Sequence, residues 1–172
     1  MASPGKNIKM VIFDVDGVLT DGGIIIDAYG IETKKFNVKD GTGIKYLIRS
    51  GLQVAFITGR QSMVVSLRAK ELGVTDVFQD AKNKMEPYEQ LLAKYGLKDE
   101  DICYIGDDLP DIPVMRRAGF AAAVSNAPSE VKNAAAFVTS VAGGQGAARE
   151  LAEKILKDQD KWKTILSRYQ QE

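Results

Sequence analysis

Two aspartates near the N-terminus are the residues of this sequence best suited to chemistry. Asp14 and Asp16 stand one residue apart, directly after the apolar run 10–13 and before Gly17. A short apolar run that ends at polar residues is typical of a strand buried on both faces. Alternation along an extended chain places both aspartates on the same side. Two carboxylates so close need a cation or a proton between them, which predicts either a metal site or a nucleophile beside an acid/base group.

Three further groups of polar residues follow apolar runs later in the chain. These groups are Thr58 with Arg60, then Lys84, then Asp107 with Asp108 and Asp111. Three carboxylates within five residues repel one another and need a cation. A lysine at a helix N-terminus opposes the helix dipole, which favours an anion such as phosphate beside Lys82 or Lys84. Mg²⁺ with a lysine and a hydroxyl forms a clamp for a phosphoryl group, and a carboxylate can form an aspartyl-phosphate.

Apolar runs alternate with helical patterns along the chain, which predicts an α/β fold with a doubly wound, mostly parallel sheet. The expected strands are 10–13, 53–57, 77–78, 102–105, 120–124 and 136–138. The expected helices end at Gly51, Gly73 and Gly96, and the second carries Met63, Val64, Leu67 and Leu72 as core residues. Because the carboxyl ends of parallel strands lie along one edge, we expect the four polar groups to converge there.

Four segments outside this pattern carry expectations of their own. A β-hairpin is predicted at about 23–36, and its isoleucines 24–26 pack either on the body or, as we favour, on another subunit. A polar loop is expected at 37–43, with Asp40 either an N-cap or a ligand contact. The glycine-rich stretch 143–150 is a linker or a loop that closes over a site, and 158–172 is an amphipathic helical tail.

The composition excludes several classes of function. The 172 residues suit a single domain, 1–172, and 23 basic residues balance 23 acidic ones, so no footprint for nucleic acid is visible. No apolar stretch approaches the roughly 20 residues that span a bilayer, and the first residues lack the apolar core of a secretion signal. The lone Cys103 predicts an inert core thiol and a cytoplasmic protein. The absence of histidine excludes histidine triads and histidine-bound zinc.

Taken together, four stretches resemble the motifs of the haloacid dehalogenase superfamily. They are Asp14-Val15-Asp16-Gly17-Val18-Leu19-Thr20, Ile57-Thr58-Gly59-Arg60, Lys84 and Gly106-Asp107-Asp108-Leu109-Pro110-Asp111. The resemblance implies a Rossmann-like core in which Asp14 is the nucleophile and Asp16 the general acid/base. It implies that Thr58 and Lys84 hold the phosphoryl group. It further implies a Mg²⁺ site made by Asp14, the main-chain carbonyl of Asp16 and Asp107, with Asp108 and Asp111 as supporting carboxylates.

The stretches 36–44 and 143–150 resemble, more narrowly, capless tetrameric sugar-acid phosphatases of that superfamily. The resemblance implies a homotetramer whose hairpins form a barrel, a neighbouring subunit over each site, and an octulosonate 8-phosphate of lipopolysaccharide synthesis as substrate. The implied substrate contacts are Asn37, Val38, Lys39, Asp40, Gly41, Arg60, Arg68 and Lys84. The sequence departs from the usual pattern at Asp80, where glycine is common, and at Asn83, where aspartate is common.

Three alternatives remain open on the sequence alone. The substrate could be another sugar acid phosphate, such as a nine-carbon one. The chain could be a non-catalytic oligomerisation module, although every motif residue is present. A phospho-receiver domain also uses carboxylates, a threonine and a lysine, but its phosphorylated aspartate stands alone at the end of an internal strand.

Overall fold

A parallel sheet forms the centre of the protein. The computed structural model describes residues 3–170, so residues 1–2 and the last two residues of the expected tail lie outside the described range. The sheet has the order β5-β4-β1-β6-β7-β8, with every neighbouring pair parallel. Its strands are β1 (Met10–Phe13), β4 (Gln53–Ile57), β5 (Asp76–Phe78), β6 (Ile102–Gly106), β7 (Phe120–Ala123) and β8 (Phe137–Val138). Each lies within one residue of its predicted bounds, which confirms the α/β prediction.

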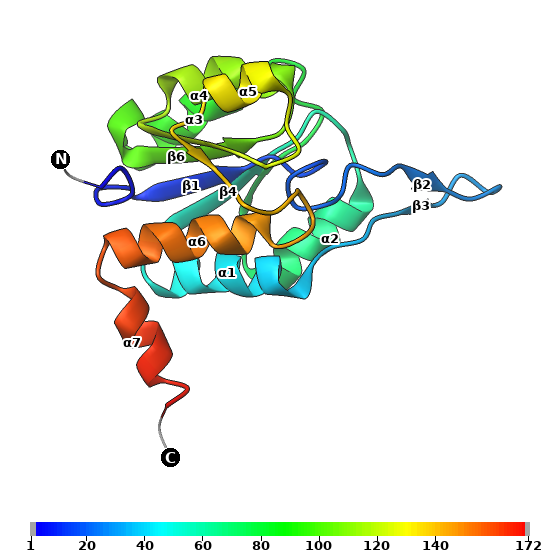
Figure 1. Cartoon of the computed structure of the whole chain (residues 1–172). Coiled ribbons are helices and arrows are strands. Elements are labelled where there is room, and N and C mark those ends of the chain that lie inside the picture. The colour runs from blue at the N-terminus through cyan, green and yellow to red at the C-terminus, as the bar shows by residue number, and fades with distance from the viewer. Residues whose placement is uncertain (1–2, 171–172) are drawn as a thin grey trace.

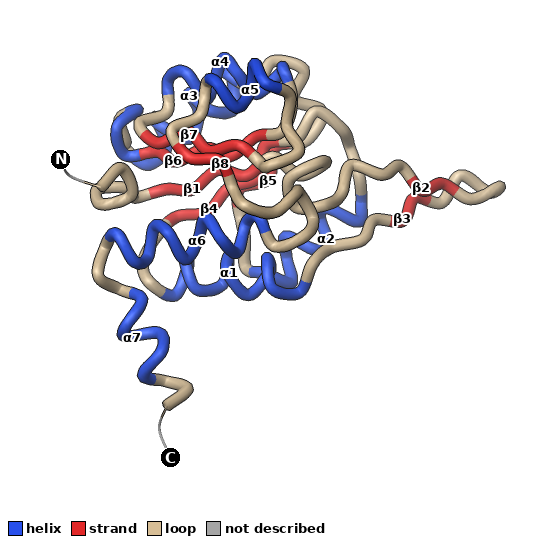
Figure 2. The backbone as a smooth tube through the Cα atoms, in the orientation of Figure 1, coloured by secondary structure: helices blue, strands red, loops and turns tan. Residues whose placement is uncertain are grey.

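Helices cover both faces of the sheet, as Figures 1 and 2 show. One face carries α1 (Val38–Arg49), α2 (Met63–Leu72) and α6 (Ala147–Asp158), and the other carries α3 (Met85–Tyr95), α4 (Ile112–Arg117) and α5 (Ser129–Asn133). The single-turn 3-10 helices are η1 (Asp99–Asp101) and η2 (Leu109–Asp111), and α7 (Trp162–Ser167) follows α6. Within residues 3–170 we find no helix of the length and apolarity that a bilayer crossing needs.

Strand β1, one of the two middle strands of the sheet, is completely buried. All four of its side chains are completely buried, and Phe13 meets Phe56 of β4 edge to face at 6.4 Å between ring centroids. A strand with neighbours on both edges and helices on both faces is held rigidly by packing and by its hydrogen bonds. The two aspartates that follow it are therefore fixed at the centre of the sheet's carboxyl edge.

Helix α1 begins earlier than predicted. Residues 38–43 are helical, and the side chain of Asn37 caps this helix by accepting a hydrogen bond from the Lys39 N–H at 2.8 Å. The loop expectation was wrong because the glycines there serve close packing: a Cβ at Gly43 would lie 3.0 Å from the Cα of Arg149 in α6. The two helices can approach each other only because this position has no side chain.

Asp40 is not the N-cap of its own helix. Its buried Oδ1 accepts a hydrogen bond at 2.8 Å from the backbone N–H of Arg149, in the first turn of α6. The aspartate therefore satisfies a free N–H group of a different helix and joins the N-terminal ends of α1 and α6.

Helix α2 buries only part of the set predicted for its core: Leu72 is buried as predicted and Val64 is half-buried, but the other two residues are exposed. Met63 and Leu67 are 79% and 62% exposed, whereas Val65 and Ala69 are buried together with Leu72. Both sets have helical spacing, so periodicity alone could not select the face that meets the sheet. The exposed pair leaves apolar surface on the outside of the molecule.

The predicted hairpin is present, and it projects away from the body as an arm (Figure 1). Strands β2 (Ile25–Ile26) and β3 (Glu32–Thr33) pair antiparallel, and Ile24, Ile31 and Tyr29 are exposed with the isoleucines of β2. The hairpin therefore does not bury its isoleucines on its own body, which excludes one of the two expectations for it.

The glycine-rich stretch packs against the segment that follows the first aspartates. The Gly144 N–H donates to the Val18 carbonyl at 2.9 Å, and a Cβ at Gly143 would lie only 1.6 Å from the Gly17 carbonyl oxygen. Such a close approach of two backbones requires glycine. In the expected tail, Trp162 of α7 packs edge to face on Tyr46 at 6.0 Å.

Candidate active site

The four polar groups line one cavity at the carboxyl edge of the sheet, as the sequence predicted. The cavity has a volume of about 360 Å³. Its lining residues are Asp14, Asp16, Thr58, Gly59, Arg60, Ala81, Lys82, Lys84, Asp107, Asp108, Pro110 and Asp111. In an open parallel sheet this edge is where ligands bind, so the cavity is the candidate active site.

A buried ion pair network forms the floor of the cavity. The Lys84 Nζ donates to Oδ1 of Asp14 at 2.8 Å and to Oδ1 of Asp111 at 2.6 Å, and all three side chains are buried. These two carboxylates supply the negative charge that a lysine at the start of α3 was expected to need. Burial lowers the pKa of Lys84, but Asp14 and Asp111 outweigh burial and raise it above its ordinary value. Lys84 is therefore a fixed positive charge at neutral pH.

Asp14 lies in an environment that disfavours its charge. Burial first, and then the charge of Asp111, raise the pKa of Asp14 well above its ordinary range, although Lys84 acts in the opposite direction. A carboxylate that is crowded in this way gains from a cation beside it. A second positive charge, in addition to that of Lys84, would therefore stabilise the charged form of Asp14.

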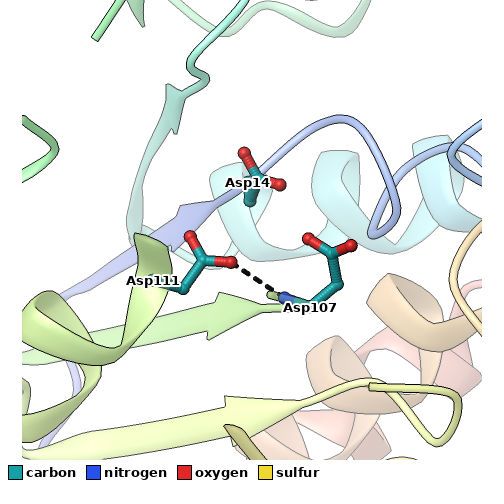
Figure 3. A group of neighbouring side chains, drawn as sticks. All are labelled: Asp14, Asp107 and Asp111. Carbon is teal, nitrogen blue, oxygen red and sulfur yellow. Dashed lines mark hydrogen bonds between the residues drawn. The ribbon is translucent and has the colours of Figure 1, made fainter. Parts of the chain in front are cut away.

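Asp14, Asp107 and Asp111 can bring one oxygen each within 4.8 Å of one another (Figure 3), close enough to share a cation. Asp111 is already engaged, because its Oδ2 accepts the N–H groups of Asp107 at 2.9 Å and of Asp108 at 3.1 Å. Its Oδ1 accepts the Tyr104 hydroxyl at 2.6 Å as well as Lys84. Asp14 and Asp107 are thus the carboxylates left to bind an ion, and Asp111 holds the loop that carries Asp107.

The backbone at Gly17 allows Asp107 to approach. Gly17 has a φ of +90°, and a Cβ there would lie 1.9 Å from Oδ2 of Asp107. A side chain at this position would be strained by the backbone and would displace the carboxylate. Gly17 is therefore required for Asp107 to reach its position in the acidic site.

Asp16 points toward the base of the hairpin. Its carboxylate forms an ion pair with Lys34, and its Oδ2 lies 3.9 Å from Nε of Arg60. Arg60 in turn donates to Glu32 at 3.1 Å. Sequence reasoning missed Lys34 and Glu32. The pattern of a two-strand hairpin does not show that the base of this hairpin lies beside the carboxyl ends of β1 and β4.

Thr58 and Tyr104 complete the buried part of the site. Thr58 is buried at the end of β4, and its Oγ1 accepts the Arg60 N–H at 3.5 Å. The sequence pattern predicts Tyr104 only as part of an apolar strand, but a buried tyrosine hydroxyl needs a partner, and here that partner is Asp111. Burial, and then Asp111, raise the pKa of Tyr104 well above its ordinary value, so it stays a hydrogen-bond donor.

The structure does not bring the expected substrate contacts 37–41 and Arg68 into this cavity. Asn37, Asp40, Gly41 and Arg68 line a separate cavity of about 10 Å³, while Val38 and Lys39 are exposed. Arg68 lies over the ring of Phe36 at 5.6 Å and pairs with Glu71 at 2.6 Å. Within one chain, only Arg60 and Lys84 of the expected contacts line this cavity, because Asn37 caps α1 and the others lie on α1 and α2.

The two departures from the usual pattern have local structural roles. Asp80 has a φ of +52°, the left-handed region that glycine adopts most easily and aspartate tolerates. The Oδ1 of Asn83 accepts the Met85 N–H at 3.2 Å in the first turn of α3. Neither residue lines the acidic cluster, so neither changes its charge balance.

The acidic cluster predicts a specific response to pH. Burial is the main cause that raises the pKa of Asp107 to about 6 from its ordinary value of 3.8. The cation-free folded protein then binds more protons than the unfolded chain, so its free energy of unfolding should fall as pH rises from about 4 to about 6. Asp14 contributes with the same sign. Thermal unfolding with a chelator measures this slope, and Asp107→Asn should flatten it.

Added Mg²⁺ should reverse the slope, because a metal ion competes with protons for the same carboxylates. Calorimetric titration should accordingly show weaker Mg²⁺ binding at pH 5 than at pH 7.5, with protons released on binding. Mg²⁺ binding of equal affinity at both pH values would contradict the assignment of Asp14 and Asp107 as its ligands.

Comparison with known proteins agrees with this geometry. A family model described as haloacid dehalogenase-like hydrolase matches residues 64–151. The chain is 45% identical over 155 residues to the 3-deoxy-D-manno-octulosonate 8-phosphate phosphatase KdsC of Yersinia pestis, over 90% of this chain and 83% of that relative. A probable YrbI family phosphatase from Pseudomonas syringae pv. phaseolica 1448a superposes with a TM-score of 0.97 at 47% identity, and the match covers 98% of this chain and 96% of that chain.

A third relative was solved with ligands. The 3-deoxy-D-manno-octulosonate 8-phosphate phosphatase of Moraxella catarrhalis, in complex with a magnesium ion, a phosphate ion and a KDO molecule, has a TM-score of 0.95 at 41% identity and covers 97% of this chain and 96% of that chain. The chain belongs to the haloacid dehalogenase-like hydrolases. The family match confirms the resemblance seen in the four motifs. More narrowly, the chain is similar to the 3-deoxy-D-manno-octulosonate 8-phosphate phosphatases, as the stretches 36–44 and 143–150 indicated.

Proposed function

We propose that the protein is a magnesium-dependent phosphatase that hydrolyses 3-deoxy-D-manno-octulosonate 8-phosphate to the free sugar acid and phosphate. The observation that supports this most strongly is the arrangement of Asp14, Lys84 and Asp107 around one cavity in a chain that closely resembles phosphatases of that substrate. We propose that this step serves lipopolysaccharide synthesis in the cytoplasm, a compartment in which a buried thiol such as Cys103 stays reduced.

Each residue of the site has a separate role in phosphoryl transfer. An oxygen of Asp14 attacks phosphorus to form an aspartyl-phosphate, while Lys84 and Thr58 hold the phosphoryl oxygens. Asp16 gives its proton to the leaving sugar oxygen as the P–O bond breaks. It then takes a proton from the water that attacks the phosphorus and frees Asp14. The fixed charge of Lys84 is needed because an anion attacks an anion.

The acidic cluster suits Mg²⁺, which prefers oxygen ligands and retains several waters. Asp14, Asp107 and the main-chain carbonyl of Asp16 would hold the ion, with Asp111 and Asp108 as supporting carboxylates. When bound, Mg²⁺ neutralises charge on the phosphoryl group and on the two carboxylates. Phosphate release should therefore require Mg²⁺ and be lost on chelation.

A panel of sugar-acid phosphates tests the substrate. We expect the highest kcat/KM for octulosonate 8-phosphate, with nine-carbon sugar acid phosphates and p-nitrophenyl phosphate well below it, because Arg60 at the cavity mouth is placed to meet the sugar acid's anionic group. A nine-carbon sugar acid phosphate that matched or exceeded the octulosonate would overturn the substrate assignment. Complete inactivity on every phosphate ester would favour an oligomerisation module instead.

We propose further that the chain assembles into a homotetramer through its hairpin arm. The exposed isoleucines of the arm and the exposed Met63 and Leu67 would then be covered by neighbouring copies. In this assembly a neighbour helps to close each cavity, and residues 37–41 and Arg68 would reach substrate only in the assembled form.

Disrupting the hairpin arm should lower both assembly and activity. We expect Ile25→Glu to shift the protein from tetramer to smaller species in gel filtration with light scattering, because a buried charge in an apolar interface is costly. Tyr169→Glu, at an exposed position that follows α7 and lies outside the arm, is the matched control and should leave the elution unchanged. A wild-type protein that elutes as a monomer would contradict the proposed assembly.

A further inference from the structure

A small ion network connects the hairpin base to the proposed acid/base aspartate. Lys34 pairs with Oδ1 of Asp16 and lies 3.4 Å from Oε1 of Glu32. Arg60 contacts the same Glu32 at 3.1 Å and approaches the other oxygen of Asp16 at 3.9 Å. Two acidic and two basic side chains thus alternate in a closed ring of ion pairs at the mouth of the cavity.

The burial of Lys34 distinguishes it from an ordinary surface lysine. Its side chain is 2% exposed, whereas that of the adjacent Lys35 is 65% exposed and pairs with Asp21 at 3.0 Å. Burying an ammonium group is unfavourable unless it is paired, so the contacts of Lys34 with Asp16 and Glu32 maintain its position. Lys34 cannot turn outward without breaking both contacts.

Glu32 is itself held in place from the body of the protein. It accepts hydrogen bonds from Arg60 at the end of β4 and from the hydroxyl of Ser62, the residue before α2. This anchoring means that Lys34 is fixed to the rigid carboxyl edge of the sheet, although it belongs to a projecting arm. The orientation of the Asp16 carboxylate is then set from two directions, by Lys34 on one oxygen and by Arg60 near the other.

We infer that Lys34 is a positioning residue for Asp16 and thereby for proton transfer to the leaving oxygen. The inference rests on the proposed function, in which Asp16 Oδ–H donates its proton to the sugar oxygen as the bond from that oxygen to phosphorus breaks. Asp14 forms its bond to phosphorus in the same step. Lys34 contacts neither substrate nor phosphorus and acts by holding the carboxylate that moves the proton.

The test uses the dependence of the reaction on the leaving group. Substituted phenyl phosphates of similar size, from p-nitrophenyl to phenyl, differ mainly in how much their leaving oxygen needs a proton. The quantity kcat/KM reports the steps up to release of the alcohol. In the wild type, acid catalysis by Asp16 should keep the slope of log kcat/KM against leaving-group pKa shallow.

We expect Lys34→Met to steepen this slope. The loss in kcat/KM should be small for p-nitrophenyl phosphate and on the order of a hundredfold for phenyl phosphate and for octulosonate 8-phosphate, the lower end of what general acid catalysis contributes. Lys34→Arg should restore part of the activity with poor leaving groups. Lys35→Met is the matched control, one residue away, and should leave every rate unchanged.

Other outcomes would overturn the inference. An equal loss on all phenyl phosphates would mean that Lys34 acts on the fold or on attack by Asp14, and a loss confined to the sugar phosphate would mean that it binds the sugar. If Lys34→Met does not fold, Glu32→Gln should give the same selective loss, because Glu32 anchors Lys34. A wild type that is active on phenyl phosphates but inactive on the octulosonate would reject the proposed substrate and leave the role of Lys34 open to the same slope test.

Discussion

Replacing Asp14 with asparagine is expected to abolish phosphate release while the protein stays folded. The amide oxygen can still accept the hydrogen bond from Lys84 that Asp14 Oδ1 accepts at 2.8 Å, but an amide cannot form the aspartyl-phosphate. We expect kcat to fall by at least about a thousandfold, since removal of a nucleophile leaves only binding and electrostatic effects. The measurement is phosphate release from octulosonate 8-phosphate at saturating Mg²⁺.

The fold of this variant should not suffer. The asparagine removes one negative charge from a buried cluster in which Asp111 and Asp107 repel Asp14, so cation-free stability should be equal or higher than in the wild type. Asp21→Asn is the matched control, because Asp21 is exposed and lies on the same segment, and it should keep full activity. Turnover that survives in Asp14→Asn would rule out Asp14 as the nucleophile.

Replacing Lys84 with methionine is expected to damage both stability and activity. The change leaves Asp14 and Asp111 buried without the ammonium that now contacts both. Breaking a buried ion pair by removing one partner costs about 3–5 kcal/mol in free energy of unfolding. The loss of a fixed positive charge facing the phosphoryl group should lower kcat/KM by at least about a hundredfold.

Urea unfolding at two pH values separates these effects. The stability deficit of Lys84→Met should be largest at neutral pH and smaller at pH 5, because burial and the charge of Asp111 raise the pKa of Asp14, and protonation of Asp14 removes its repulsion with Asp111. Saturating Mg²⁺ should restore part of the stability. Lys82→Met provides the control: its ion pair with Asp80 is fully at the surface, and the free energy of unfolding should change by less than about 0.5 kcal/mol. A neutral-pH deficit as small as that control's would contradict the buried network.

The arrangement of the sheet and the convergence of the polar groups could be predicted because both follow from local patterns. The run Met10–Phe13 consists of apolar residues alone, which predicts a buried strand. The first polar side chains therefore come directly after this strand. Parallel strands then place Asp14, Thr58 and Asp107 along one edge, whatever the details of the helices. The charge argument for a lysine at a helix start left Lys82 and Lys84 open, and the structure places Lys84 on Asp14 while Lys82 pairs with Asp80 at the surface.

The features that could not be predicted depend on contacts between distant segments. Met63 and Val65 both fit a helical stripe, and only the position of the sheet decides which one is buried. Gly43 reads as a loop residue until α6 is placed beside it. The contact of Lys34 with Asp16 joins a hairpin to a strand end, and no local signal in either segment indicates it.

The covalent role of Asp14 is tested most directly by trapping the intermediate. Protein mixed with octulosonate 8-phosphate and Mg²⁺ would be quenched within the first turnover and treated with borohydride, which reduces an aspartyl-phosphate to homoserine. Peptide mass spectrometry should find homoserine at position 14 and nowhere else, and Asp14→Asn should give none. Phosphate release without modification at position 14, or modification of Asp16 or Asp107 instead, would contradict the proposed mechanism.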